Sequence, residues 1–222
     1  MQKSDNKLSV TLDENSPAIQ HLCQRDKRLA KVIKMIGPLT NEPHDEDPYS
    51  FFIHEIIEQM MSVKAARHIY GRLESLCDGA VTVERIRALS DEEIRSTGTS
   101  VAKAEYIRNV TYAVESGRWN FEEMKDMPDQ EVISLLTSVR GIGNWTAKMC
   151  LIFVLNRPNI LPYEDGAFLQ TYRWLYKTSD CSPESVKKRC RKWSPYATAA
   201  SRYFYRALDL GLTKEEFHLY KE

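Results

Sequence analysis

Two glycines that flank one apolar residue, Gly141-Ile142-Gly143, interrupt a long apolar stretch in the second half of the chain. Glycine tolerates positive φ and lets a second backbone come close. The pattern therefore predicts a tight turn between two helices, with Ile142 pointing into the core. Asn144 is a favourable N-cap, and we expect it to cap the second helix. The N–H groups around such a turn can bind a phosphate, and a hairpin that only packs is the alternative.

The hydrophobic pattern predicts helices throughout the chain. Apolar residues recur at helical spacing from 17 to 36, where Gly37 is the expected stop, and Asp47-Pro48 is a typical start of the next helix. Ser62 and the capping box that begins at Ser90 mark two further helix starts. We find no period-two alternation and no repeat at a fixed period. The expected fold class is therefore all-α.

The composition is that of an ordinary globular protein, with 42% hydrophobic and 28% charged residues in a chain of 222. No apolar run approaches the roughly 18 residues of a membrane span. The first ten residues lack the charged-then-apolar order of a secretory signal. We therefore expect an intracellular protein without a membrane partner, located in the cytoplasm or nucleoid, or in the nucleus of a eukaryote.

Charge is distributed unevenly, although 31 basic and 31 acidic residues cancel overall. The segment 137–206 holds 12 Lys and Arg against 4 Asp and Glu, a net charge of +8, whereas residues 1–136 carry a net charge of −6. The basic segment contains the glycine turn. A solvated charged face is one interpretation, and the coincidence with the turn favours a surface that faces DNA.

Three motifs follow one another along the chain. They are the block Gln59-Met60-Met61-Ser62-Val63-Lys64-Ala65-Ala66, the glycine turn continued by Asn144-Trp145-Thr146-Ala147, and Asp165 about twenty residues later. Together they resemble the helix-hairpin-helix DNA glycosylases, in particular the 3-methyladenine DNA glycosylase II branch, over about Asp47 to Tyr205. The resemblance implies two helical lobes with the active site in the cleft between them. Its expected parts are an N-terminal segment 1–46 that joins the terminal lobe, a central lobe 47–157 that ends in the hairpin, and the remainder 158–222.

Asp165 is the candidate catalytic residue. Cleavage of an N-glycosidic bond builds positive charge on the sugar, and a fixed carboxylate can stabilise that charge and orient water. An alkylated, cationic base leaves without being protonated, so one carboxylate suffices. The alternative is an N-cap for the helix that follows, and both can hold. The neighbouring Glu164 is less favoured, because the family pattern places the aspartate two residues before a small residue, here Ala167.

Trp145 determines the expected subtype of reaction. Bifunctional relatives of the endonuclease III and 8-oxoguanine types carry a lysine at this position, and its amine forms a Schiff base with the sugar. Here Lys148 stands three residues later. The resemblance therefore implies a monofunctional enzyme that leaves an abasic site. An aromatic residue beside the hairpin also suits stacking on a flipped base, with core packing as the alternative.

Other positions match family residues that contact the base or the DNA. Met60 falls where relatives insert a wedge into the duplex, which an adaptable methionine suits, and core packing on the preceding helix face is the alternative. Met149 and Tyr205 replace the Tyr and Trp of the branch, which changes the shape of the pocket. The implied base pocket is Trp145, Met149 and Tyr205, and the implied DNA-binding residues are Met60, Ser62, Gly141, Gly143, Asn144 and Thr146.

No cofactor is expected to be required. Family hairpins bind Na⁺ or K⁺ through backbone carbonyls, which map here to Thr137, Val139 and Gly141. Some relatives carry a four-cysteine iron–sulfur cluster after the catalytic region. Only Cys181 and Cys190 lie there in this chain, too few to hold one, and we expect reduced thiols.

The sequence thus predicts a hydrolase of base excision repair, a monomeric DNA glycosylase that removes alkylated purines of the 3-methyladenine type from double-stranded DNA. A bifunctional glycosylase/lyase for oxidised bases and a non-catalytic helix-hairpin-helix DNA-binding protein are the alternatives, along with an all-α interaction scaffold. Trp145 disfavours the first, and Asp165 in register disfavours the second.

Overall fold

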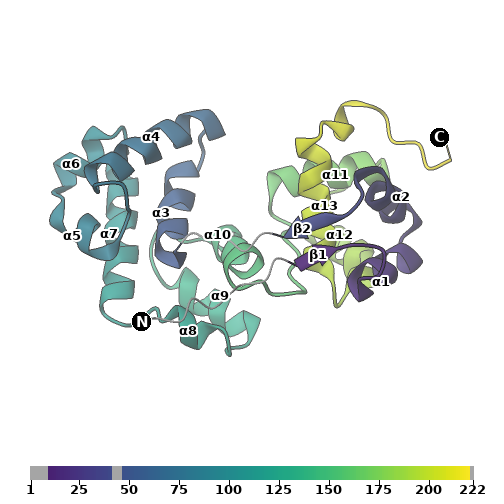
Figure 1. Cartoon of the computed structure of the whole chain (residues 1–222), viewed down its shortest axis with the longest axis horizontal. Helices are drawn as coiled ribbons and strands as arrows, with labels where there is room; N and C mark the ends of the chain where they lie inside the picture. Colours follow the sequence, from purple (N-terminus) through teal and green to yellow (C-terminus); the bar gives the residue numbers. More distant parts are fainter. Residues whose placement is uncertain (1–9, 42–46, 221–222) are drawn as a thin grey trace. The chain divides into compact units, whose positions relative to one another are not determined.

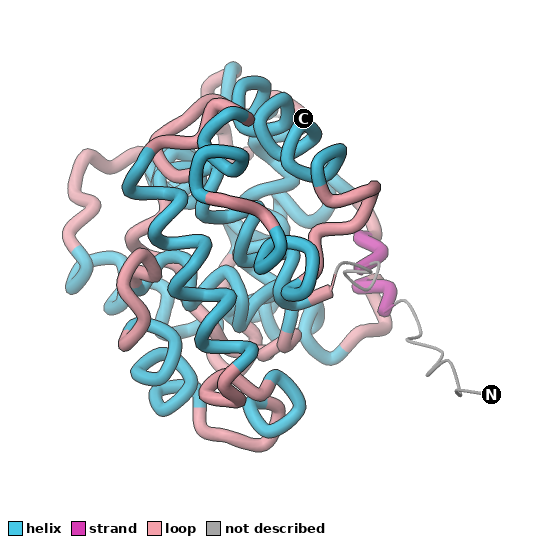
Figure 2. The backbone as a smooth tube through the Cα atoms, turned by 90° about the vertical axis from the view of Figure 1, so that its left-hand side faces the viewer, coloured by secondary structure: helices cyan, strands magenta, loops and turns pink. Residues whose placement is uncertain are grey.

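The computed structural model describes residues 10–41 and 47–220. The chain divides into two compact units, which we call the terminal unit (Met1–Pro43 with Asn156–Glu222) and the central unit (His44–Leu155). Helices dominate the described part of the chain (Figure 2). The prediction of an all-α fold is confirmed.

In the described part of the terminal unit, five helices pack around an aromatic core. Figure 1 labels these helices. Phe168 and Phe204 stack with ring centroids 5.0 Å apart, and Trp193 meets the edge of Phe204 at 5.2 Å. All three side chains are fully buried, so the ends of the chain share one hydrophobic core. The helices are α1 (Pro17–Arg25), α2 (Lys27–Ile36), α11 (Gly166–Tyr176), α12 (Pro183–Cys190) and α13 (Ala197–Asp209), with short helical turns η2 (Arg191–Trp193) and η3 (Leu212–Lys214).

The prediction of one continuous helix at the start of this unit is corrected. The single helix expected over 17–36 is broken at Asp26, which is 3% exposed and caps α2 by accepting the N–H groups of Arg28 and Leu29. Asp26 also accepts the indole N–H of Trp193 at 3.1 Å and pairs with Lys192 at 2.9 Å. These distant partners make the break favourable. Gly37 ends α2 as predicted, with φ 80°.

A short antiparallel ladder joins β1 (Val10–Leu12) to β2 (Leu39–Asn41), where the sequence showed no strand pattern. The hydroxyl of Tyr203 on α13 donates to the carbonyls of Leu12 and Gly37 at 3.3 and 3.1 Å. Tyr203 thus fastens the ladder to the helical core at the last residue of β1 and just before β2 begins. Three-residue strands are too short to give a readable alternation.

The central unit is built around α3, which packs against α4 and α7. Phe52 of α3 lies 4.8 Å from the ring of Trp119 in its core. Ser90 forms the predicted capping box with Glu93. The elements are α3 (Pro48–Glu58), α4 (Val63–Leu76), α5 (Val83–Ala88), α6 (Asp91–Ser96), α7 (Val101–Glu115), α8 (Phe121–Met124), α9 (Asp129–Thr137), α10 (Asn144–Met149) and the π-helix η1 (Cys150–Val154).

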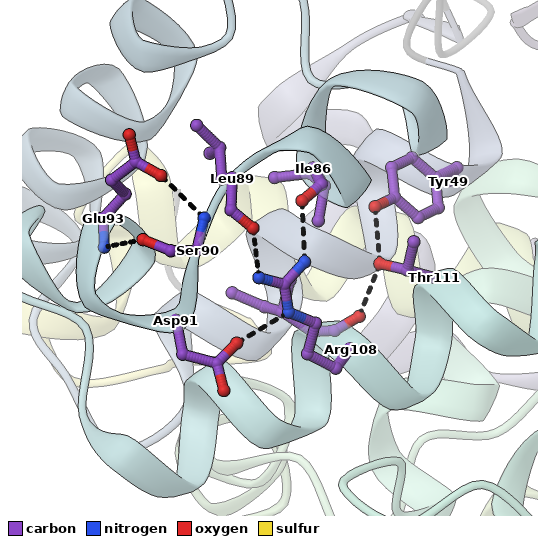
Figure 3. A network of polar contacts seen from close by, with 9 residues as sticks. Tyr49, Ile86, Leu89, Ser90, Asp91, Glu93, Arg108 and Thr111 are labelled. Carbon is purple, nitrogen blue, oxygen red and sulfur yellow. Dashed lines mark hydrogen bonds and ion pairs between the residues drawn. The ribbon is translucent and has the colours of Figure 1, made fainter.

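Arg108 fixes α7 to the two short helices before it. Its guanidinium donates to the carbonyls of Ile86 and Leu89 and to the Asp91 carboxylate (Figure 3). One turn further along α7, the Thr111 hydroxyl lies 2.8 Å from the hydroxyl of Tyr49 on α3. Helix α7 is therefore held near its middle by charged and neutral hydrogen bonds, which makes it a firm support for its neighbours. No helix in the described ranges is long and apolar enough to cross a membrane.

Candidate active site and nucleic-acid interface

The glycine turn joins α9 to α10 as predicted. Val139 and Ile142 are buried, which confirms that Ile142 points into the core. Gly141 has φ 106°, and a Cβ built there would lie 2.3 Å from Cγ of Tyr106 on α7. Two independent constraints, the backbone conformation and the close approach of a ring, therefore require glycine at this position.

The N-cap of α10 is Gly143, so the prediction that Asn144 caps this helix is wrong by one residue. The N–H of Ala147 donates to the Gly143 carbonyl at 3.0 Å, which makes Asn144 the first helical residue. Gly143 and Asn144 are both exposed, and a Cβ at Gly143 would meet no atom within 4 Å. Thr146 is only 1% exposed, and its role in DNA binding stays a prediction.

A second exposed turn ends α3. The N–H of Met61 donates to the Glu58 carbonyl at 3.0 Å, with φ −48° and ψ 122° at Gln59 and φ 57° at Met60. These angles describe a type II turn, whose third position normally holds glycine because φ is positive. Met60 occupies that position and its side chain is 103% exposed. Packing of Met60 on the apolar face of α3 is therefore excluded.

Ser62 follows this turn and caps α4, as predicted. Its hydroxyl accepts the N–H of Ala65 at 3.3 Å, and the side chain is exposed. The turn between the end of α3 and the start of α4 thus presents Met60, Met61 and Ser62 to solvent. Met60, Met61 and Val63 are exposed apolar side chains close together in the chain, and such a group is a candidate contact surface.

Helix α10 carries the residues implied to line a base pocket. Trp145 is partly exposed, whereas Met149 is 5% and Lys148 is 7% exposed. The helix continues as η1, where the N–H of Leu155 donates to the Cys150 carbonyl at 2.9 Å. Insertions of π-helix of this kind concentrate at functional sites. The sequence gave no indication of it, because its apolar spacing is compatible with an ordinary α-helix.

Asp165 caps α11 in the terminal unit. Its Oδ1 accepts the N–H of Phe168 at 2.6 Å, and the residue is 9% exposed. Phe168 is in the aromatic core, so this hydrogen bond attaches the carboxylate to a rigid part of the unit. The neighbouring Glu164 is exposed. The Asp165 carboxylate is held by its cap hydrogen bond, and its predicted capping interaction is confirmed.

Tyr205 is on α13, the helix that packs against α11. The Thr171 hydroxyl of α11 donates to the Phe204 carbonyl of α13 at 3.1 Å, and the Phe168 and Phe204 rings stack between the same helices. Tyr205 itself is partly buried against the hydrophobic core. The helices that carry Asp165 and Tyr205 therefore form one rigid pair within the terminal unit.

The carbonyl groups implied to bind a monovalent cation are partly used within the protein. Val139 O accepts the N–H of Ile142 at 3.1 Å, and Gly141 O accepts Nε2 of Gln59 at 3.0 Å. A carbonyl oxygen has two lone pairs, so each retains one for a ligand. Carbonyl oxygens are suitable donors for Na⁺ or K⁺. The donor chemistry therefore fits such an ion, and the site stays a prediction.

Other potential metal-binding and nucleophilic groups have ordinary explanations. Within the described ranges, His54, Glu55 and Glu58 of α3 bring ligand atoms within 4.8 Å of one another. His54 and Glu58 are one helical turn apart and form a 3.7 Å ion pair when the histidine is protonated. Burial raises the pKa of the Cys150 and Cys190 thiols, which keeps them in the unreactive protonated form.

The fold and these features define an α-helical protein with a helix-hairpin-helix element of the DNA-repair type. The sequence profile described as "HhH-GPD superfamily base excision DNA repair protein" matches residues 53–195, and the chain belongs to this superfamily. The resemblance inferred from the three motifs is thereby confirmed.

Relatives and solved structures of this superfamily match most of the chain. The DNA-3-methyladenine glycosylase 1 of Schizosaccharomyces pombe is 30% identical over 86% of this chain and 86% of that protein. A crystal structure of a DNA-3-methyladenine glycosidase from Bacillus halodurans is 34% identical, with TM-score 0.83 over 95% of this chain and 97% of that one. The Schizosaccharomyces pombe 3-methyladenine DNA glycosylase in complex with abasic DNA is 28% identical, with TM-score 0.80 over 93% and 100% of the two chains.

A bifunctional enzyme shares the fold at lower identity. The 8-oxoguanine glycosylase/lyase of Clostridium acetobutylicum, solved in complex with duplex DNA, is 18% identical, with TM-score 0.72 over 87% of this chain and 70% of that one. At this identity the likeness shows the fold alone. The reaction subtype therefore depends on the residues of this chain.

Proposed function

We propose that the chain is a monofunctional DNA glycosylase of base excision repair, which hydrolyses the N-glycosidic bond of alkylated purines of the 3-methyladenine type and leaves an abasic site. DNA is its partner. The observation that carries the proposal is the fixed, buried carboxylate of Asp165 in a chain of this superfamily. The names of the relatives and the abasic-DNA complex of one of them support it.

Asp165 supplies the negative charge that the reaction needs. Positive charge develops on the sugar as the base departs, and a carboxylate held in place before the reaction stabilises it without reorganisation. Its burial reduces screening by water, which strengthens that interaction. The hydrogen bond from the Phe168 N–H holds Oδ1 of this carboxylate in place. In the proposed reaction the held carboxylate acts on the sugar and the attacking water.

An alkylated purine leaves as a neutral base, because N-alkylation of the nucleotide has already placed positive charge on it. No general acid is then required to protonate the leaving group. Trp145, Met149 and Tyr205 are each proposed to contact the base, as the family resemblance implies. The partly exposed indole of Trp145 offers a π-face to a cationic purine, which aromatic rings attract.

Binding to the duplex is assigned to the two exposed turns of the central unit. The first N–H groups of α10 have no partner within the helix, and the open surface at Gly143 gives a DNA phosphate access to them. A monovalent cation held by the carbonyls of Thr137, Val139 and Gly141 would add positive charge there. Met60 is the proposed wedge that fills the space left by the flipped nucleotide, and Ser62 and Asn144 are further proposed DNA contacts.

The monofunctional subtype follows from the lysine that this chain lacks at position 145. Lys148, the amine within one turn of helix, is 7% exposed. We further propose that the protein acts as an intracellular monomer on double-stranded DNA that contains damaged bases.

The product is expected to be an intact strand that carries an abasic site. Borohydride should trap no covalent enzyme–DNA adduct on a lesion-containing duplex, and strand breaks should appear on a gel only after alkali, because water and not an amine attacks the sugar. An adduct would contradict the monofunctional assignment, and its loss in Lys148→Met would identify the responsible amine. Binding without any base release would favour a non-catalytic DNA-binding protein.

A further inference from the structure

The exposed turn at Met60 is unfavourable by itself. A non-glycine residue with φ 57° persists only where surrounding contacts hold it. A fully exposed methionine has few contacts of its own, so the restraint must come from its neighbours. Two side chains that belong to none of the roles assigned above provide it.

The first is Lys103 in the opening turn of α7. Its Nζ donates to the carbonyls of Ile57 and Gln59 at 2.8 and 2.7 Å. These oxygens belong to the end of α3, where carbonyls have no partner within the helix and a positive charge is favourable. Partial burial lowers the pKa of Lys103 from its ordinary value. The ammonium group has therefore given up part of its hydration to reach the backbone on either side of Glu58.

The second is Gln59, the residue immediately before Met60. Its Nε2 donates to the Gly141 carbonyl at 3.0 Å, so the Met60 turn is hydrogen-bonded to the glycine turn of the hairpin. Gly141 in turn rests on Tyr106 of α7, three residues after Lys103. One face of α7 thus supports both exposed turns, and α7 itself is fastened by Arg108 and Thr111.

We infer that Lys103 and Gln59 are positioning residues that hold Met60 in the protruding conformation in which it enters the duplex. Gln59 also sets the position of the Met60 turn relative to the hairpin that binds the phosphate, so that a duplex engaged by the hairpin meets the wedge in register. This inference rests on the proposed function. It assigns the preorganisation of the wedge to two side chains that need not touch DNA or base.

The test uses the full chain and two measurements. A duplex with a tetrahydrofuran abasic-site analogue beside 2-aminopurine reports insertion of the wedge as a rise in fluorescence, with no chemistry required. The second measurement is the single-turnover rate of base release from methylated duplex DNA. Lys103→Met and Gln59→Ala should each reduce the 2-aminopurine response and slow release by about tenfold, the effect of losing a hydrogen bond that involves a charged or buried partner. Lys103→Arg should retain most of both.

A double-mutant cycle identifies the route of the effect. In a Met60→Ala background, Lys103→Met and Gln59→Ala should each change the rate by less than about twofold, because the side chain that they position is already absent. Lys125→Met, which removes an exposed lysine from the same unit, is the control for loss of charge. Melting temperatures identify variants that fail to fold. If Lys103→Met fails to fold, Gln59→Ala alone tests the inference.

Each unfavourable outcome has a distinct meaning. Additive effects in the Met60→Ala background, or variants that match the wild type in both measurements, would overturn the inference and leave the proposed function intact. A wild-type protein that inserts its wedge but releases no base would overturn the proposed function, and the fluorescence comparison would still decide the inference.

Discussion

Asp165→Asn should reduce base release by about 10²–10³-fold or more, the scale on which loss of a preorganised electrostatic group slows an enzyme. DNA affinity and melting temperature should stay close to those of the wild type. The reason is that asparagine is as good an N-cap as aspartate, so the hydrogen bond from the Phe168 N–H is preserved while the charge is lost. Single-turnover excision and binding to an abasic-analogue duplex measure the two effects separately.

Asp47 offers a matched control for this substitution. It caps α3 by accepting the N–H groups of Tyr49 and Ser50, and it is exposed. Asp47→Asn makes the same chemical change at a second helix cap and should leave excision unaltered. Near-normal excision by Asp165→Asn would show that Asp165 is only a helix cap, and Glu164 would then be the candidate catalytic carboxylate.

Substitutions at the two glycines of the hairpin should have different effects. Gly141→Ala places a Cβ against the ring of Tyr106 at a φ of 106°, so it should destabilise the central unit, with the backbone conformation alone costing of order 1–3 kcal/mol. Gly143→Leu meets no atom of the protein near its Cβ. It should leave the fold intact apart from a weaker helix cap, and lower affinity for all duplexes by about tenfold through lost charge-assisted hydrogen bonds.

Thermal unfolding and a salt titration of DNA binding distinguish these two effects. Gly141→Ala should lower the melting temperature more than Gly143→Leu does. Gly143→Leu should weaken binding without changing the preference among damaged bases, since phosphate contacts carry no base identity. If a folded Gly143→Leu protein binds duplexes with wild-type affinity and salt dependence, the first turn of α10 is not the phosphate site.

The sequence predicts structure that depends on residues close together in the chain. The hairpin shows both the success and the limit of such predictions. A single apolar residue between two glycines is enough to predict the turn and the burial of Ile142. It is not enough to place the cap, because Gly143 and Asn144 are both acceptable N-caps. The choice depends on which carbonyl receives the Ala147 N–H.

The exposure of Met60 could have been predicted from the helix cap at Ser62. Its spacing continues the apolar face of α3, which favours burial, yet the cap at Ser62 requires the preceding helix to end before it. The four residues between α3 and α4 have to form a turn, and Met60 falls in it. A helix cap is therefore better evidence of a boundary than apolar periodicity is of a continuing helix.

Contacts between distant residues explain what the sequence did not predict. The break at Asp26 depends on Trp193 and Lys192, more than 160 residues further along the chain. The link from Lys103 to Ile57 joins separate helices. Neither Asp26 nor Lys103 belongs to a sequence motif. The π-helix after Met149 has an amino-acid composition that does not distinguish it from an α-helix. Such features become visible only once the helices are packed.

The central claim is that this chain hydrolyses the bond between an alkylated purine and its sugar, and the most direct measurement is chromatography of the bases released from methylated duplex DNA. The account predicts that the wild-type protein releases free 3-methyladenine and that Asp165→Asn releases none above background. DNA that is bound but keeps its methylated bases, or equal release by the two proteins, would contradict it.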